Sequence, residues 1–154
     1  MRTMVMSFKP DVYERIACGQ KIFEHRRTFP NETIKVYMYV SKPVCAVTGI
    51  LLLGKRHSLQ EWKLEFKEDK EAVNRISDFM KSADYAMEIL EFTETIKIPL
   101  VDLREANIGF VVPQMYYYID NRPILKFLED KLTITGRTIQ HTFDVITSDI
   151  VCRH

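Results

Sequence analysis

The stretch SFKPDVYERIACGQKIFEHRR at residues 7–27 decides how the fold begins. It overlaps a short apolar segment, residues 4–8, which predicts a first strand that ends before the proline. Asp11 precedes Glu14 by three residues, a spacing typical of a capping box, so we expect Asp11 to cap a short helix. Gly19 is well placed to end that helix, because glycine readily adopts the left-handed conformation of a helix C-terminus.

Residues 21–28 predict a second strand directly after this glycine. Because side chains alternate between the two faces of a strand, Glu24 and Arg26 are expected on one face. His25 and Arg27 are then expected on the other face, with Arg27 solvated or paired structurally. Lys21 stands at the start of the strand, so its ammonium can point across a cleft.

The rest of the chain alternates between strand-like and helix-like patterns. Period-two alternation and apolar runs predict strands, and apolar spacings of three and four residues predict helices. Gly49 interrupts an apolar strand, which indicates a bulge or a close backbone approach. Together these patterns predict an α+β protein, built on a mixed or antiparallel β-barrel with an early helix and a few peripheral helices. The expected strands are 34–40, 44–53, 83–98, 115–119 and 138–145, and the expected helices lie within 58–81, 102–106 and 123–131.

Length and composition indicate one globular domain over residues 1–154, with 46% hydrophobic and 28% charged residues. The three cysteines, Cys18, Cys45 and Cys152, have no CxxC spacing, so we expect neither a disulfide framework nor a zinc site. The N-terminus does not resemble a signal peptide, and the longest apolar run, residues 44–53, is far shorter than the about 20 residues of a membrane span. We therefore expect a cytoplasmic protein with no membrane partner.

Charge is distributed unevenly along the chain. Residues 1–63 carry 11 Lys and Arg against 5 Asp and Glu, a net charge of +6, whereas residues 64–154 carry −5. A basic N-terminal half could present a positive face to a phosphate backbone. The alternative is that these charges are scattered over the folded surface, and the net charge of +1 does not decide between the two.

Several motifs, in a fixed order, resemble the ASCH family of the PUA-like superfamily. The first two are SFKP at residues 7–10 and GQKIFEHRR at residues 19–27, which are similar to the family's S-x-K-P and G-x-K-x-x-E-x-R-R elements. The resemblance extends over about residues 4–130 and leaves 131–154 as a C-terminal extension. The later matching segments are 36–43 (VYMYVSKP), 46–53, 85–89 (YAMEI) and 112–116 (VPQMY).

This resemblance implies a PUA-like pseudo-barrel with a helix after its first strand, and a cleft lined by the strand that carries Lys21, Glu24 and Arg26. It also implies binding of RNA or a nucleotide-like ligand, because most relatives are proposed RNA binders. Some relatives act as amidohydrolases on acylated cytidines, and others are described as ribonucleases. Fold-level analogy alone does not decide among these activities.

Lys21, Glu24 and Arg26 are the central candidates for a site. Lys21 could contact a phosphate as a point charge, or activate a nucleophile if burial lowers its pKa, or be an ordinary surface lysine. Glu24 could accept hydrogen bonds from a base edge while Arg26 binds a phosphate or stacks on a base. Alternatively, Glu24 and Arg26 form an ion pair that only stabilises the barrel.

Position 24 weakens the amidohydrolase interpretation. Those relatives have Thr where this chain has Glu24, and the Thr hydroxyl is the expected nucleophile beside the lysine. A carboxylate does not replace it in simple acyl transfer, although Glu24 could act as a general base for water. If the chain is catalytic at all, Lys21 and Glu24 are the candidates.

Further candidate ligand-binding residues lie at the ends of expected elements, where binding groups tend to be placed. Residues 55–57 (KRH) form the densest basic cluster, which we expect in a loop, either contacting phosphate or solvated. Tyr116, Tyr117 and Tyr118 could stack on bases or, as we favour, pack the barrel. No metal-binding or cofactor motif is present in the sequence. The additional candidates are Ser7, Lys9, Ser41, Lys42, Lys55, Arg56 and Gln114.

Three hypotheses follow from the sequence. The first is a module that binds RNA or a nucleotide in a basic cleft. The second is a small hydrolase that acts on a nucleoside amide or on RNA. The third is a protein-interaction domain that uses the tyrosines at 116–118. The identity of the ligand, the oligomeric state and the role of residues 131–154 stay open at this level.

Overall fold

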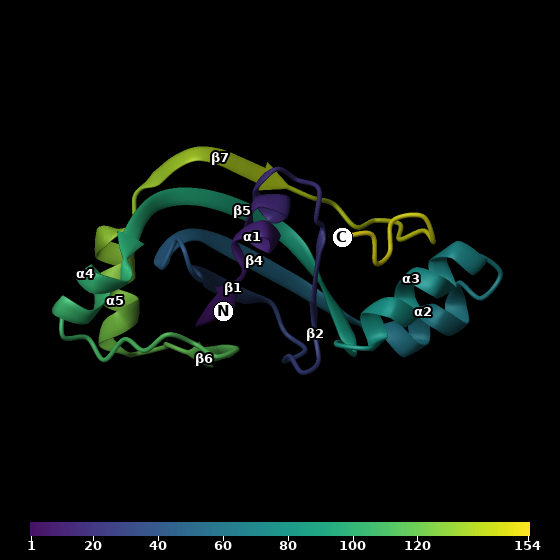
Figure 1. Ribbon diagram of the computed structural model, residues 1–154, viewed down its shortest axis with the longest axis horizontal. Coiled ribbons are helices and arrows are strands. Elements are labelled where there is room, and N and C mark those ends of the chain that lie inside the picture. Colours follow the sequence, from purple (N-terminus) through teal and green to yellow (C-terminus); the bar gives the residue numbers. More distant parts are fainter.

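One curled sheet of seven strands organises the computed structural model, which describes residues 1–154 (Figure 1). The strand order is β2-β5-β4-β3-β1-β6, and β7 pairs with β5. Strands β1 and β3 are parallel, and the other pairs are antiparallel. The elements are β1 (Arg2–Phe8), α1 (Pro10–Ala17), β2 (Phe23–Arg26), β3 (Ile34–Val40), β4 (Ala46–Ser58), α2 (Leu59–Glu65), α3 (Lys70–Met80), β5 (Tyr85–Pro99), α4 (Leu100–Glu105), β6 (Tyr116–Tyr118), α5 (Pro123–Lys131) and β7 (Ile134–Gln140).

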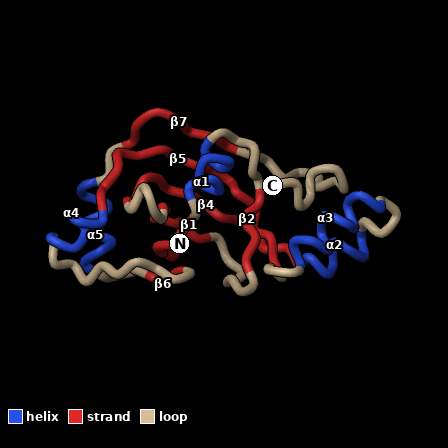
Figure 2. The backbone as a smooth tube through the Cα atoms, in the orientation of Figure 1, coloured by secondary structure: helices blue, strands red, loops and turns tan.

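Five helices surround this sheet, and they gather mainly at its two ends. Helices α4 and α5 lie together at one end, and α2 and α3 lie together at the other, with the strands between them (Figure 2). Helix α1 directly follows the first strand. The predicted α+β class, with a mixed barrel-like sheet, an early helix and peripheral helices, is therefore confirmed, and the sheet forms a curled half-barrel.

Alternation along the strands sends side chains into separate clusters on the two faces of the sheet. Val36 and Met38 of β3 belong to one buried cluster with residues of β1, β4 and β5. Tyr37 and Tyr39 point the other way, into a second cluster that α4 and α5 complete. A third cluster joins α2 and α3 to Phe23 of β2 and to the C-terminal segment.

The sheet curls where β4 bulges at Gly49. The register of β4 with β5 shifts between Val47 and Gly49, as the glycine in this strand predicts. A Cβ atom at position 49 would lie 3.1 Å from the Phe92 ring and 3.2 Å from the Thr93 carbonyl oxygen, so the backbone approach requires glycine.

Helix α1 begins two residues earlier than the sequence predicts, and its N-terminus is not capped as expected. Lys9 is the N-cap residue, no side chain caps the helix, and Pro10 occupies the first turn. Proline is favoured there because its fixed φ is already helical and it has no N–H to satisfy. Asp11 lies inside the first turn, where it pairs with Arg15 at 3.4 Å. Gly19 has a φ of +84° just after the helix, as expected.

The predictions for residues 55–57 and for the last strand are wrong. Lys55, Arg56 and His57 do not lie in a loop, because β4 continues to Ser58 through its pairing with β5. The last strand covers residues Ile134–Gln140 rather than 138–145. Its sequence is polar and most of its residues are exposed, so apolar alternation did not reveal its start.

The segment that follows β7 has no regular structure, but it packs firmly against the α3 end of the sheet. Val151 and Cys152 are buried in the third cluster, and burial raises the pKa of the Cys152 thiol to about 12. Arg75 of α3 donates hydrogen bonds to the carbonyl oxygens of Val151 at 3.2 Å and Ser148 at 2.7 Å. Residues 148–152 are therefore held in place by both apolar burial and backbone contacts.

No helix in this chain has both the length and the apolar character required to cross a membrane.

We predict that Phe92→Ala lowers the free energy of unfolding by about 3–5 kcal/mol, as expected for a buried aromatic side chain. Phe92 is fully buried, and Tyr13 packs edge-on against its ring at a centroid distance of 5.6 Å. Urea unfolding followed by the fluorescence of the single tryptophan, Trp62, measures the change. Val111→Ala, at an exposed position, is the control and should stay within about 0.5 kcal/mol of the wild type. Equal stabilities for the two variants would contradict the assigned core.

Candidate functional site

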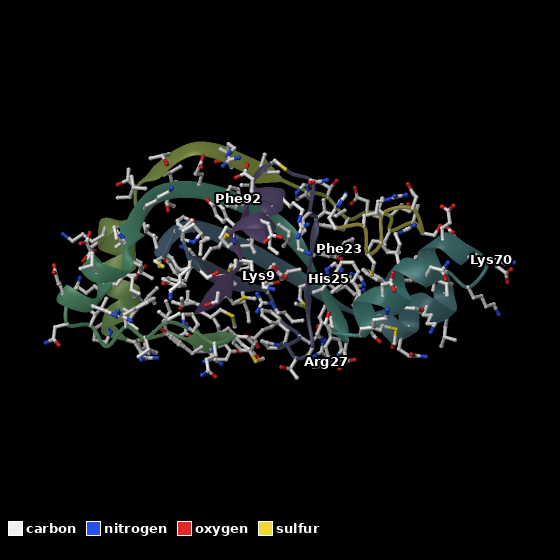
Figure 3. The ribbon with its side chains drawn as sticks, in the orientation of Figure 1. Lys9, Phe23, His25, Arg27, Lys70 and Phe92 are labelled. Carbon is white, nitrogen blue, oxygen red and sulfur yellow. The ribbon has the colours of Figure 1, made fainter.

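A cleft of about 570 Å³ opens between the end of β1, the start of α1, strand β2, helix α3 and the C-terminal segment. This volume lies within the range of small-molecule sites in proteins. Figure 3 labels two residues of its walls, Lys9 and His25, near the middle of the molecule. The cleft is lined by Ser7, Phe8, Lys9, Val12, Arg15, Lys21, Glu24, His25, Arg26, Ser41, Phe79, Ser82, Gln114 and His154.

The structure brings seven of the ten sequence-predicted candidates into this one cleft. They come from segments that are far apart in the sequence. The fold brings these segments together because the parallel strands β1 and β3 end side by side and β6 pairs with β1. Phe8 pairs with Val40 at the last position of both strands, so Ser7, Lys9 and Ser41 meet at the same edge of the sheet. The seven are Ser7, Lys9, Lys21, Glu24, Arg26, Ser41 and Gln114.

Strand β2 is an edge strand, and it carries a cleft residue that the sequence did not single out. The strand pairs only with β5, so its other edge is free. It is also shorter than predicted, because Lys21 and Ile22 precede it in an irregular segment. His25, expected on the face opposite Glu24, lines the same cleft as Glu24. Its position four residues after Lys21 was the only signal in the sequence.

Lys21 is buried, with only 5% of its surface exposed. Its Nζ donates a hydrogen bond of 2.7 Å to the backbone carbonyl oxygen of His154, and lies 3.1 Å from Nδ1 of His25. Burial lowers the pKa of Lys21 because the charged form loses solvation, and nearby Arg15 adds to the effect while Glu24 opposes it. A lysine in this state can act as a hydrogen-bond donor or, once neutral, as a base.

The His25 ring is stacked on Phe79, with the centroids 4.0 Å apart and the planes 29° from parallel. Burial holds the pKa of His25 well below its usual value of 6.5, and the positive charge of Lys21 lowers it further. The imidazole is therefore neutral near pH 7. Since Lys21 donates to Nδ1, we assign the proton of the neutral ring to Nε2, which has no partner within the protein.

Glu24 is buried as well, with 4% of its surface exposed. Its Oε1 accepts a hydrogen bond of 3.1 Å from the backbone N–H of His25 and lies 3.8 Å from Nε of Arg26. Its Oε2 has no partner in the protein. The ion pair with Arg26 therefore exists, but it occupies only one of the two carboxylate oxygens.

The guanidinium of Arg26 is held in a fixed orientation at the cleft wall. Its NH2 group donates a hydrogen bond of 2.9 Å to the carbonyl oxygen of Ser7, and its Cζ lies 5.4 Å from the centroid of the Phe8 ring. Arg27, in contrast, points away from the cleft and pairs with Asp84 at 2.8 Å. Arg26 is thus held in one orientation, although not all of its nitrogen atoms form hydrogen bonds within the protein.

Three of the predicted candidates lie outside the cleft. Lys42 is exposed in the turn that follows Ser41. Lys55 and Arg56 line a second cavity of about 590 Å³, together with a hydrogen-bonded His57–Glu88 pair. Arg56 has a structural role there, because it donates a hydrogen bond of 2.7 Å to the Phe29 carbonyl oxygen and its guanidinium lies over the Tyr85 ring.

The three consecutive tyrosines do not form a free aromatic platform. Tyr116, Tyr117 and Tyr118 are all partly buried, and they pack against the clusters on both faces of the sheet. The guanidinium of Arg2 covers the Tyr118 ring at 3.4 Å. No group of three His, Cys, Asp or Glu side chains is placed to hold a metal ion.

The architecture and the helix after the first strand are those of an ASCH-type fold. Among solved structures, the chain is similar to the crystal structure of ASCH from Zymomonas mobilis, with a TM-score of 0.64 and 19% identity over 86% of this chain and 96% of that one. A Ser-to-Ala variant of the Zymomonas mobilis protein gives a TM-score of 0.66, also with 19% identity, over 86% of this chain and 97% of that one.

No protein-family model matches the sequence, and no curated protein matches it either. The similarity to the Zymomonas mobilis structures therefore establishes the fold, and it confirms the resemblance that the sequence motifs carry at that level.

We predict that His25→Gln makes the stability of the protein less sensitive to acid. The depressed pKa means that, below about pH 6.5, the unfolded state binds a proton that the folded state does not, so the wild type loses stability as pH falls. The variant lacks this contribution, which amounts to at most about 1.4 kcal/mol per pH unit. Urea unfolding between pH 5 and 8, followed by Trp62 fluorescence, tests it. Parallel curves for both proteins below pH 6.5 would contradict the burial of a neutral His25.

Proposed function

We propose that this chain binds single-stranded RNA or a nucleotide-like ligand in the cleft around Lys21. The observation that carries the proposal is the charge of the lining: four side chains are cationic, whereas Glu24 is the one carboxylate among them. Such a surplus attracts a phosphate backbone. The four cations are Lys9, Arg15, Lys21 and Arg26.

The other lining groups suit a nucleotide as well. The hydroxyls of Ser7, Ser41 and Ser82 and the amide of Gln114 can bond to phosphate, sugar or base edges. Phe79 is partly exposed in the cleft, and an aromatic ring at this position can stack on an unpaired base. RNA binding is also in keeping with the PUA-like fold, which supports the proposal by analogy.

The remaining predicted cations have secondary roles in this proposal. Lys42 follows Ser41 at the rim and would extend the positive surface for a longer strand of RNA. Lys55 and Arg56 would act only through the long-range field, since they line a different cavity. Residues 1–154 would act as one domain, and three free cysteines suit a reducing compartment such as the cytoplasm.

We predict that a fluorescein-labelled single-stranded RNA octamer binds with an affinity that falls as salt rises, measured by fluorescence anisotropy. Lys21→Ala and Arg26→Ala should each weaken binding and lower the slope of log Kd against log salt by about 0.7 for each phosphate that the variant no longer neutralises. Lys126→Ala is the matched control, because this lysine lies on α5, outside the cleft, and is exposed. Equal effects of the three substitutions would contradict a localised site, and no binding at low salt would overturn the proposed function.

A second candidate function, hydrolysis of RNA or of a nucleoside amide, is favoured by one observation. Lys21, with its lowered pKa, lies beside the neutral His25 in a cleft that also contains Glu24. A buried amine or carboxylate in such a site can take a proton from an attacking water. The absence of a Thr at position 24 still disfavours direct acyl transfer.

If the chain is a hydrolase, Glu24→Gln should abolish turnover of the RNA octamer or of an N4-acylated cytidine while RNA binding survives. Product analysis by chromatography measures the turnover, and anisotropy measures the binding. Glu65→Gln, at an exposed position on α2, is the control that should keep full turnover. An inactive wild type would leave the chain as a binding module only.

A further inference from the structure

Glu24 lines the cleft, and one of its two carboxylate oxygens is buried with no hydrogen-bond partner within the protein. Oε1 is engaged by the backbone N–H of His25 and lies near Arg26, whereas Oε2 has no partner within the protein. Leaving a buried charged oxygen unpaired is unfavourable, and such groups normally have a hydrogen-bond partner. A ligand in this cleft is therefore expected to supply N–H donors to Glu24.

The carboxylate discriminates strongly among the four bases. An ionised carboxylate only accepts hydrogen bonds, so it attracts an edge with donors and repels an edge with acceptors. Guanine presents two neighbouring donors, N1–H and the N2 amino group. Adenine and cytosine present one amino group beside a ring-nitrogen lone pair, and uracil presents one N–H between two carbonyl oxygens. Guanine is the one base that faces a carboxylate with adjacent donors.

Lys21 supplies the complementary donor. Its Nζ donates to the carbonyl oxygen of His154 at 2.7 Å, so the site already accommodates a carbonyl acceptor at this position. The O6 carbonyl of guanine is adjacent to N1–H, and lysine is a common donor to it. His154 is exposed, so a ligand carbonyl can take its place by a local movement of the chain end.

We propose that the cleft selects guanine in single-stranded RNA, with Glu24 accepting from N1–H and the N2 amino group and Lys21 donating to O6. Arg26 and Lys9 then lie on the walls where the flanking phosphates would pass. The stacked pair of Phe79 and His25 provides a flat surface for the base. The inference rests on the proposed RNA binding and names the base that the site recognises.

Three labelled RNA octamers, differing at one position, test the proposal by fluorescence anisotropy. Each is oligouridine with guanosine, inosine or uridine at the fourth position, and inosine lacks only the N2 amino group. Wild-type protein should bind the guanosine octamer about tenfold more tightly than the inosine octamer, because inosine forms one hydrogen bond fewer to a charged group. In Glu24→Gln this preference should disappear, since an amide presents a donor to the N2 amino group.

The outcomes separate this inference from the proposed function. Equal, salt-dependent binding of all three octamers, abolished in Lys21→Ala, would overturn guanine selection and leave RNA binding in place. No binding of any octamer would overturn both. A guanosine preference that survives in Glu24→Gln would also overturn the assigned role of Glu24, provided that Trp62-monitored unfolding shows the variant to be folded.

Discussion

The pairing of strand β5 with three neighbours is the constraint on which the rest of the molecule depends. Along one edge, β5 pairs with the long strand β4; along its other edge, it pairs with β2 near its start and with β7 further on. Strands β2 and β7 therefore follow one another along the same edge of β5. Because β7 runs antiparallel to β5, the end of β7 lies near β2. The C-terminal segment that follows β7 therefore reaches Lys21.

This arrangement explains how Lys21 comes to be buried. The third cluster holds Val151 and Cys152 against Phe23, so the backbone of the chain end lies over the residues just before β2. Lys21 then donates to the backbone oxygen of His154 and to the imidazole of His25. The lowered pKa values of Lys21 and His25 both follow mainly from this burial.

The sequence predicts well those features that depend on local patterns. Strand 34–40 and helix 123–131 have the predicted bounds, because the first alternates strictly and the second begins at a proline. Residues 55–57 were predicted to lie in a loop because the apolar run ends before them. In the structure, pairing with β5 continues β4 through these polar residues. Likewise, the cleft contacts of His25, Phe79 and His154 depend on the curl of the sheet and on the path of the chain after β7, which no short motif records. The role of residues 131–154 was open for the same reason.

The hydrogen bond between Lys21 and the His154 carbonyl oxygen has a quantitative consequence for any ligand of the cleft. The carbonyl is a tethered competitor, so its effective concentration is set by the short, anchored segment behind it and does not change when the protein is diluted. The apparent dissociation constant equals the intrinsic one divided by the fraction of molecules in which Lys21 is free. Occupancy of the cleft thus depends on how firmly residues 148–154 are anchored to the rest of the protein.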